Sequence, residues 1–463
     1  MRYSPFVDRI ETALATIGGV PDHLLHGEIA GVTGLSVEIA GLGRLLSVGD
    51  RVSLQPRHGD GVPAEIVGFR NGRAQAMVQA ANEGLGPGSQ ATADPAARGA
   101  TLAVSDAWLG RVIDPLGRPL DGRGALPRGS RAHRLRADPP AATTRARLGP
   151  RIDLGVTALD SFATCRAGQR LGLFAGSGIG KSTLLAMLAR HTACDVAVLA
   201  LVGERGREVR EFLEDDLGAD AARCVTVVAT SDASPLLRRD AAYAAMTVAE
   251  HFRDQGRSVL LLMDSVTRFC LALREIGLAA GEPPATRGYP PSVFAELPRL
   301  LERAGPGAEK APGIVPGGQI TALFTVLVEG DDHNEPIADA VRGILDGHVI
   351  LDRRIADGGR YPAVDVLRSL SRTAPGCMTV EHAALARRAR SILARYAELA
   401  DLVRLGAYQA GADPESDAAI ALAPRLEAWM SQGRDERRSL QSSFAALAVL
   451  LDGQAALLDG QPA

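Results

Sequence analysis

The sequence predicts an α/β protein in three parts: a small N-terminal β-barrel, a central parallel sheet that carries a phosphate-binding loop, and a C-terminal helical domain. Three observations support this fold class. A glycine-rich turn lies between an apolar strand and a helix at residues 171–185. Apolar strands alternate with helices up to about residue 378, which is typical of a parallel sheet covered on both faces. Short apolar pieces broken by glycine precede this region, and helical stripes alone follow it.

The length of 463 residues suggests about three domains, and an apolar content of 46% is ample for buried cores. A net charge of −3 argues against bulk affinity for nucleic acid. The five cysteines lie far apart, and no apolar run approaches a membrane span, so we expect a soluble cytoplasmic protein. We divide the chain into an N-terminal amphipathic segment (1–24), the barrel (25–95), a junction and linker (96–150), the phosphate-binding domain (151–378) and the helical domain (379–463).

The N-terminal segment and the barrel contain no candidate catalytic or ligand-binding residues. Residues 3–17 place apolar side chains at helical spacing and predict a short helix, which could pack on its own domain or dock on a partner or membrane surface. From about residue 27 to 93, pieces such as Leu35–Ile39 alternate with turns and predict the barrel. A barrel that reads nucleic acid needs aromatic platforms, but Phe69 is the only aromatic residue here. We interpret the barrel as a collar for assembly.

The central region has the strands and loops of a functional sheet edge. Two loops rich in glycine and proline lie between Ala279 and Gly318, separated by a helix around Phe294–Arg303, and such loops often line functional edges. After about Met378, three apolar stripes at helical spacing predict the C-terminal domain. The candidate strands are Leu171–Phe174, Val196–Val202, Cys224–Val228, Val259–Met263 and Ile320–Val328.

The turn after the first of these strands predicts a phosphate site. It points successive backbone N–H groups into one concavity, and the next helix adds the positive end of its dipole, so a polyphosphate suits it. Lys181 would reach the β- and γ-phosphates and the Ser182 hydroxyl would hold Mg²⁺. The first glycine of the usual pattern is Ala175 here. The loop residues expected to bind nucleotide are Gly176, Ser177, Gly178, Ile179, Gly180, Lys181, Ser182 and Thr183.

Two acidic residues are expected at the same edge of the sheet. Asp264 ends the apolar strand Leu260–Met263, and such an aspartate holds the Mg²⁺ water shell in P-loop enzymes. Glu204 follows another apolar strand and could polarise the water that attacks the γ-phosphate. The alternative for Glu204 is a surface turn of arginine–glutamate salt bridges, but its position after a strand in a P-loop sheet favours catalysis.

Together these motifs resemble the catalytic-type subunits of hexameric rotary ATPases, which are built on a RecA-like P-loop domain. The chain is most similar to the ATPases of flagellar and virulence type III protein export, and the resemblance covers essentially the whole chain. The stretches that carry it are the P-loop, Gly203–Val209, Arg287–Phe294, Glu329–Asp339 and Tyr361–Arg372.

The resemblance implies roles for individual residues. Glu204 matches the catalytic glutamate, which non-catalytic subunits lack, so the chain is expected to hydrolyse ATP with Mg²⁺. Arg205 and Arg268 match arginines near the γ-phosphate, and Tyr361 matches the aromatic residue that stacks on adenine. Arg372 matches the arginine finger, which acts on ATP held by a neighbouring subunit and therefore implies a homohexamer. An internal salt bridge is the alternative for Arg372.

We expect an ATPase at the cytoplasmic base of a flagellar export apparatus, peripheral to the inner membrane. The resemblance implies a regulatory stator protein, a coiled-coil stalk protein, an export gate, chaperones and export substrates as partners, and no nucleic acid. Its N-terminus could contact the membrane. A virulence secretion ATPase is the first alternative, and His333 and Asp352 depart from the residues expected in relatives. An ATP synthase subunit, a ring-shaped RNA translocase and a non-enzymatic scaffold rank lower. The acidic run 329–335 is interpreted as a solvated loop rather than a metal site.

Overall fold

The computed structural model describes residues 23–95, 99–309, 315–328 and 335–452. The predicted N-terminal helix and most of the acidic run 329–335 lie outside these residues. None of the described helices is long and apolar enough to cross a membrane.

The N-terminal strands form a closed barrel in the order β1-β2-β5-β4-β3-β6. Closure leaves no unpaired strand edge. Alternate residues face inward, and Val37, Ile39, Leu54 and Ile66 are completely buried there. The strands are β1 (Leu25–Thr33), β2 (Ser36–Ala40), β3 (Arg51–Leu54), β4 (Val62–Arg70), β5 (Arg73–Val78) and β6 (Gln90–Ala93). The predicted small barrel is confirmed.

The central region is built on one sheet with the strand order β17-β16-β10-β15-β13-β11-β12-β8, and β14 pairs with β15. Most neighbours are parallel, but β14 and β17 run antiparallel to theirs. The strands are β8 (Val112–Ile113), β10 (Arg170–Ala175), β11 (Val196–Glu204), β12 (Cys224–Thr230), β13 (Ser258–Asp264), β14 (Gly305–Pro306), β15 (Gln319–Leu327), β16 (Gly347–Leu351) and β17 (Val364–Ser371). The shorter elements before it are β7 (Thr101–Leu102), the 3₁₀ turn Asp106–Trp108 and β9 (His133–Arg134).

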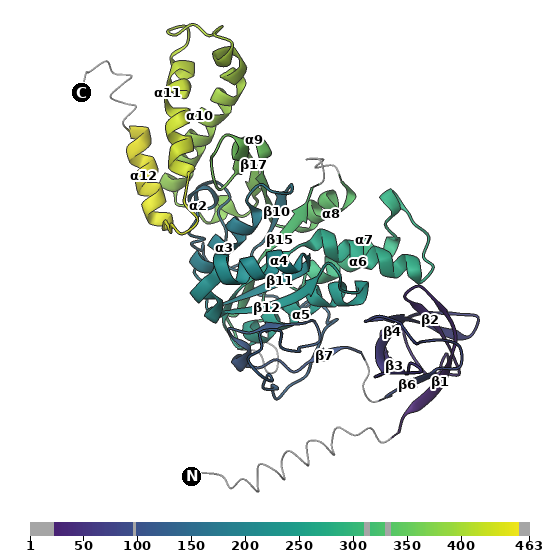
Figure 1. Ribbon diagram of the computed structural model, residues 1–463. Coiled ribbons are helices and arrows are strands. Elements are labelled where there is room, and N and C mark those ends of the chain that lie inside the picture. Colours follow the sequence, from purple (N-terminus) through teal and green to yellow (C-terminus); the bar gives the residue numbers. More distant parts are fainter. Residues whose placement is uncertain (1–22, 96–98, 310–314, 329–334, 453–463) are drawn as a thin grey trace, which may run out of the picture. The chain divides into compact units, whose positions relative to one another are not determined.

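Helices connect most of these strands along the chain, as Figure 1 shows. They are α2 (Thr157–Phe162), α3 (Lys181–His191), α4 (Gly206–Glu211), α5 (Pro235–Asp254), α6 (Val266–Ala279), α7 (Pro291–Leu301), α8 (Pro336–Ile344) and α9 (Arg353–Asp357). Short helical segments complete this set, a π-helical one at Phe212–Leu217 and 3₁₀ ones at Gly218–Arg223, Thr286–Gly288 and Ala374–Gly376. The strands β10, β11 and β13 are buried along almost their whole length, because helices cover both faces of a parallel sheet.

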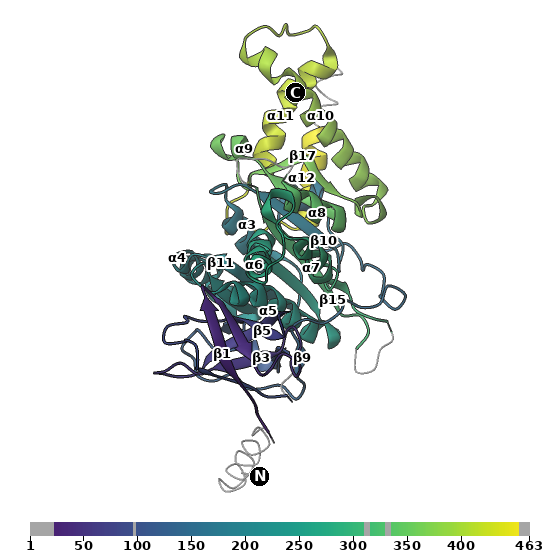
Figure 2. The same cartoon turned by 90° about the vertical axis from the view of Figure 1, so that its right-hand side faces the viewer.

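The C-terminal region contains α10 (Val380–Arg404), α11 (Pro414–Met430) and α12 (Leu440–Asp452). Helices α10 and α11 lie side by side as an antiparallel pair, visible in Figure 1 and again in Figure 2. Ala389 of α10, Leu426 of α11 and Phe444 of α12 join the same buried cluster as the sheet and α3. The predicted stripes of α11 and α12 therefore face this core, whereas the predicted stripe of α10 is only partly buried and contacts the core through Ile392 and Tyr396. The predicted fold class is confirmed.

Candidate active site

The P-loop lies between β10 and α3, at the carboxyl edge of the sheet. Gly178 and Gly180 have positive φ angles of 77° and 84°, a conformation that costs a residue with a side chain about 1–2 kcal/mol. Gly180 is the N-cap of α3, so the first N–H groups of that helix face the loop. Ile179 instead points into the core and is buried.

A cleft of about 670 Å³ opens beside this loop. Its size suits a small-molecule ligand, and it is lined mainly by the predicted residues. The lining comprises Gly176, Ser177, Gly178, Gly180, Lys181, Ser182, Thr183, Glu204, Arg205, Glu208, Arg268 and Arg353, together with Ala175, Leu327 and Val328.

Lys181 pairs with two carboxylates, that of Glu204 in the cleft lining and that of the buried Asp264 beside it. Its Nζ forms an ion pair with Asp264 Oδ2 and lies 4.0 Å from Glu204 Oε1. Thr325 Oγ1 on β15 donates to the other Asp264 oxygen at 2.7 Å and fixes its orientation. The strand order explains this convergence. Because β11 and β13 are parallel neighbours and β15 separates β13 from β10, their carboxyl ends bring both acids to the P-loop lysine.

Glu204 is held in an environment that favours its neutral form. Burial raises the pKa of Glu204 to about 7, and the negative charge of Asp264 adds to this effect. The positive charges of Lys181 and Arg268 act in the opposite direction. A carboxyl group with a pKa near neutrality is suited to accept or relay a proton.

Three arginines border the cleft. Arg268 Nη1 donates to the Gly203 carbonyl, and its Nη2 lies 3.4 Å from Glu204 Oε2. Arg205 is exposed and pairs with Glu208 at 3.2 Å. Arg353, which was not among the predicted site residues, donates to the Ser177 carbonyl at 2.7 Å. Arg353 lies just after the carboxyl end of β16, which is parallel to β10. Glu204 and Asp264 were predicted because they lie at the carboxyl ends of parallel strands, and the same rule would have indicated Arg353 if β16 had been predicted.

The remaining two predicted site residues lie on either side of β17. The Tyr361 ring packs over Gly180, where an added Cβ would come within 3.2 Å of it, but Tyr361 does not line the cleft. Arg372 lies at the opposite edge of the sheet. The β17 residue Ser371 pairs with Gly347 at the start of β16, whereas Val364 pairs with Leu351 at its end. The structure therefore does not bring Arg372 to the P-loop of its own chain.

The oxygen donors at the cleft are chemically suited to Mg²⁺, which prefers one or two protein oxygens together with waters and phosphate oxygens. Ser182 in the cleft lining supplies a hydroxyl group, and Asp264, which is buried beside Lys181 and does not itself line the cleft, supplies a carboxylate. Among the residues that the structure describes, no three His, Cys, Asp or Glu side chains form a cluster that could hold a metal alone. A metal here would be shared with phosphate groups. The fold and the cleft thus define a nucleotide-binding protein of the P-loop ATPase class.

Comparisons with known proteins place the chain within that class. Residues 155–371 match the nucleotide-binding domain of the ATP synthase alpha/beta family, and residues 378–449 match the T3SS EscN ATPase C-terminal domain. A flagellum-specific ATP synthase of Caulobacter vibrioides is 50% identical over 96% of this chain and 100% of its own length. A type 3 secretion system ATPase of Xanthomonas euvesicatoria is 45% identical over 92% of this chain and 94% of its own.

The solved structures agree with these relatives. The assembled ATPase EscN from the type III secretion system of enteropathogenic E. coli has a TM-score of 0.84 and 39% identity, and the match covers 92% of this chain and all of that one. The chain therefore belongs to the family of flagellum-specific ATP synthases and type III secretion ATPases, and it is an ATP-hydrolysing enzyme. The resemblance inferred from the motifs is confirmed.

Proposed function

We propose that this protein hydrolyses ATP to drive or assist flagellar type III export, by helping to release chaperones and to unfold or feed substrates. The observation that carries the proposal is the buried Glu204 carboxylate beside Lys181 and Arg268, because a nucleotide-binding scaffold has no need of a base there. The full-length similarity to several flagellum-specific relatives supports the flagellar assignment.

The chemistry follows from the positions of the side chains. In the free enzyme Lys181 neutralises Asp264, and on binding ATP its ammonium group would turn to the β- and γ-phosphates. This movement would free the Asp264 carboxylate, which together with the Ser182 hydroxyl group could hold Mg²⁺ or its water shell. Mg²⁺, when bound, neutralises charge on the β- and γ-phosphates. Glu204 would orient the attacking water and take its proton.

The arginines and the tyrosine complete the proposed site. Arg268, held on the Gly203 carbonyl, and the exposed Arg205 would stabilise charge on the γ-phosphate. Arg353 is already bonded to the P-loop and would keep Ser177 in place. Tyr361 lies over Gly180 with an exposed ring, which is consistent with stacking on adenine.

We infer a homohexamer from the position of Arg372. Its exposed side chain lies at the far edge of the sheet, so an arginine finger at this position could serve only another subunit. Arginine fingers contribute about 10³–10⁵-fold to turnover. The similarity to an assembled EscN, and to EscN in complex with its central stalk EscO, supports a ring with a stalk protein at its centre.

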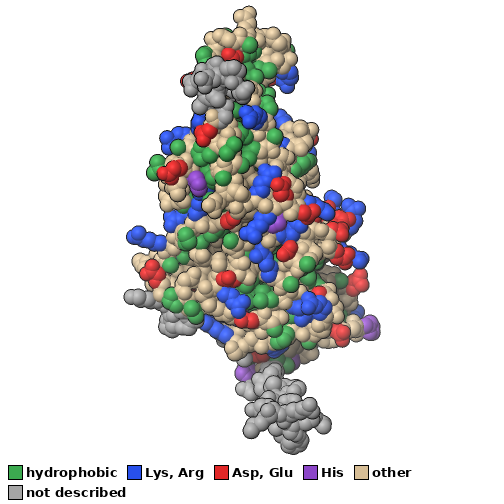
Figure 3. Space-filling view, turned by 90° about the vertical axis from the view of Figure 1, so that its left-hand side faces the viewer, with side chains coloured by type: hydrophobic (Ala, Val, Ile, Leu, Met, Phe, Trp, Pro, Cys, Tyr) green, Lys and Arg blue, Asp and Glu red, His purple; other side chains and the backbone are tan. Residues whose placement is uncertain are grey.

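The other partners follow from the proposed export role. They are a regulatory stator protein, an export gate, chaperones and export substrates, at the cytoplasmic base of an inner-membrane export apparatus. A membrane contact through the N-terminal segment belongs to the same proposal. Nucleic acid is not proposed as a partner. On the face shown in Figure 3, the Lys and Arg side chains of the described residues are interspersed with Asp and Glu, whereas nucleic-acid binding needs a basic stripe.

The test is complementation of a deletion strain, with swimming and filament assembly as readouts. The wild-type gene should restore both, and Glu204→Gln should restore neither while its product accumulates to the same level. A virulence secretion ATPase is the second candidate, favoured by the relative from Xanthomonas euvesicatoria. It would be supported by a deletion strain that swims normally but fails to secrete virulence substrates. Full motility with Glu204→Gln would refute the catalytic assignment.

A further inference from the structure

The backbone around Arg372 is anchored from inside the sheet, although its side chain is exposed. Arg372 directly follows β17, and its Nη2 donates to the Arg342 carbonyl at 3.2 Å. Ser371, immediately before it, is buried, and Thr373, immediately after it, is half-buried. Both hydroxyl groups point to the same partner.

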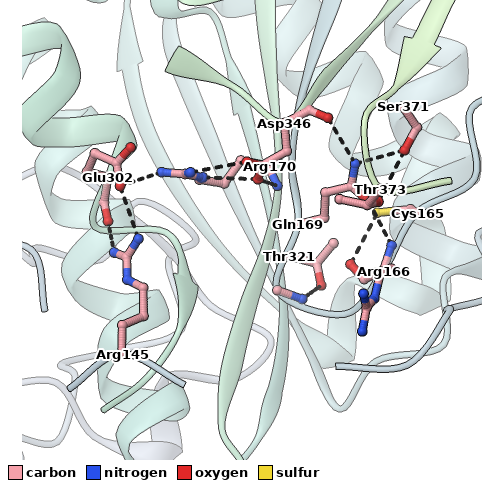
Figure 4. Close-up of polar contacts among 11 residues, drawn as sticks. Arg145, Cys165, Arg166, Gln169, Arg170, Glu302, Thr321, Asp346, Ser371 and Thr373 are labelled. Atoms are coloured by element: carbon pink, nitrogen blue, oxygen red, sulfur yellow. Dashed lines mark hydrogen bonds and ion pairs between the residues drawn. The ribbon is translucent and has the colours of Figure 1, made fainter. Parts of the chain in front are cut away.

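That partner is Gln169, a completely buried glutamine. Its Nε2 donates to Ser371 Oγ at 3.0 Å, and its Oε1 accepts from Thr373 Oγ1 at 2.6 Å (Figure 4). The Arg166 backbone N–H donates to the same Oε1 at 2.9 Å. One side-chain amide therefore holds the residues on both sides of Arg372, and its oxygen and nitrogen are each used. A buried amide with all its partners satisfied fixes local geometry.

Arg170, the residue after Gln169, holds Arg372 through Asp346. The Arg372 backbone N–H donates to the Asp346 carbonyl at 2.9 Å. The Asp346 carboxylate in turn accepts from Arg170 at 3.0 Å from the backbone N–H and 3.2 Å from Nε. Glu302 forms ion pairs with both Arg170 and Arg145, as Figure 4 shows. Gln169 thus anchors Ser371 and Thr373 directly, and Arg170 anchors Arg372 through Asp346.

Gln169 and Arg170 also begin the strand that ends in the P-loop. Strand β10 runs from Arg170 to Ala175, and the six residues span about 20 Å from one edge of the sheet to the other. The cleft is at the carboxyl end of this strand, and Gln169 is at its amino end, so Gln169 does not line the cleft.

We propose that Gln169 is a positioning residue for the arginine finger, which it orients toward the ATP of the neighbouring subunit through Ser371 and Thr373. This inference rests on the proposed role of Arg372. Loss of the amide would leave the finger in the ring but displaced, and a misplacement of about 1 Å costs about 10² in rate.

The test is a double-mutant comparison of ATP turnover in the assembled enzyme. Gln169→Leu should lower kcat by about 10- to 100-fold, with the KM for ATP changed by less than about threefold, because its own cleft is intact. In the Arg372→Ala background the same substitution should lower kcat by no more than about twofold, since no finger remains to be positioned. Sedimentation should show the same ring for each variant.

Thr321→Val is the matched control. It removes the hydrogen bond of 2.9 Å from the Gly168 N–H to Thr321 Oγ1, one residue away from Gln169, without touching the residues beside Arg372. It should lower stability by a similar amount and leave kcat within about twofold of wild type. If Gln169→Leu does not fold, the double variant Ser371→Ala/Thr373→Val removes the same two hydrogen bonds to Gln169 by changing the residues on either side of Arg372. It should lower kcat by the same factor.

Each outcome decides the question. The proposal is overturned if Gln169→Leu lowers kcat equally with and without Arg372, or if it leaves kcat unchanged. A loss of kcat in Thr321→Val comparable to that in Gln169→Leu would also overturn it. Near wild-type turnover in Arg372→Ala alone would refute the finger itself. That result would defeat the proposed function of Arg372, and is distinct from a failure of Gln169 to position a working finger.

Discussion

The ATPase rate should rise with pH through neutrality because of Glu204. Burial, with help from the charge of Asp264, raises the pKa of Glu204 to about 7. Only the ionised carboxylate can accept a proton from the attacking water. The second-order rate constant kcat/KM reports the free enzyme, in which this pKa applies, so it should follow the ionised fraction of Glu204.

The expected size of the effect follows from that value. About one tenth of Glu204 is ionised at pH 6 and about nine tenths at pH 8, so kcat/KM should increase by about tenfold between them and level off above. The assay is initial phosphate release at low ATP, with excess Mg²⁺ and constant ionic strength, across this pH range.

Arg268→Gln provides a control on the cause. The positive charge of Arg268 lowers the pKa of Glu204, so its removal should move the midpoint of the profile to higher pH, whatever it does to the maximal rate. A flat profile from pH 6 to pH 8 in the wild-type enzyme would refute the reasoning, as would a midpoint that moves to lower pH in Arg268→Gln.

Three further predictions concern stability and the P-loop. Because the folded state raises the pKa of Glu204 from 4.5 to about 7, this carboxyl group stabilises the fold fully below pH 4.5, and the contribution is lost as pH rises through about 7. The side chain in Glu204→Gln cannot ionise, so at pH 8 the free energy of unfolding of this variant, measured with denaturant, should exceed that of the wild type by up to roughly 3 kcal/mol. At pH 4.5 the two should not differ in this way. Gly180→Ala should weaken ATP binding more than Gly178→Ala, because both have positive φ but only Gly180 lies against Tyr361; equal losses in a binding titration would contradict this. Thr325→Val should raise the Mg²⁺ concentration needed for half-maximal rate, since it removes a donor from the Asp264 carboxylate; an unchanged Mg²⁺ dependence would refute that role.

The parts of the site that could be predicted are those that follow from sequence neighbours and one topological rule. The P-loop is a continuous segment, so its glycines and Lys181 are visible in the sequence. Glu204 and Asp264 each end a long apolar strand, and the carboxyl ends of parallel strands share one edge. Their placement at the same edge of the sheet needed no further information.

The parts that were missed depend on short or irregular strands. Strand β16 has only five residues, and β17 alternates buried and exposed side chains as the antiparallel edge of the sheet. Neither gives the long apolar signal of the inner strands. Without them, Arg353 could not be assigned to the cleft, nor Gln169 to Arg372. The pairing of Lys181 with Asp264 is a property of strand order, which the sequence does not state.

The most direct test of the account is ATP binding and single-turnover hydrolysis by Glu204→Gln. The substitution keeps the size of the side chain and the hydrogen-bonding oxygen but removes the base. We expect the assembled variant to bind ATP with Mg²⁺ as tightly as the wild type and to hydrolyse it about 10²–10⁴ times more slowly. Wild-type turnover in this variant would contradict the assignment of Glu204 as the catalytic residue.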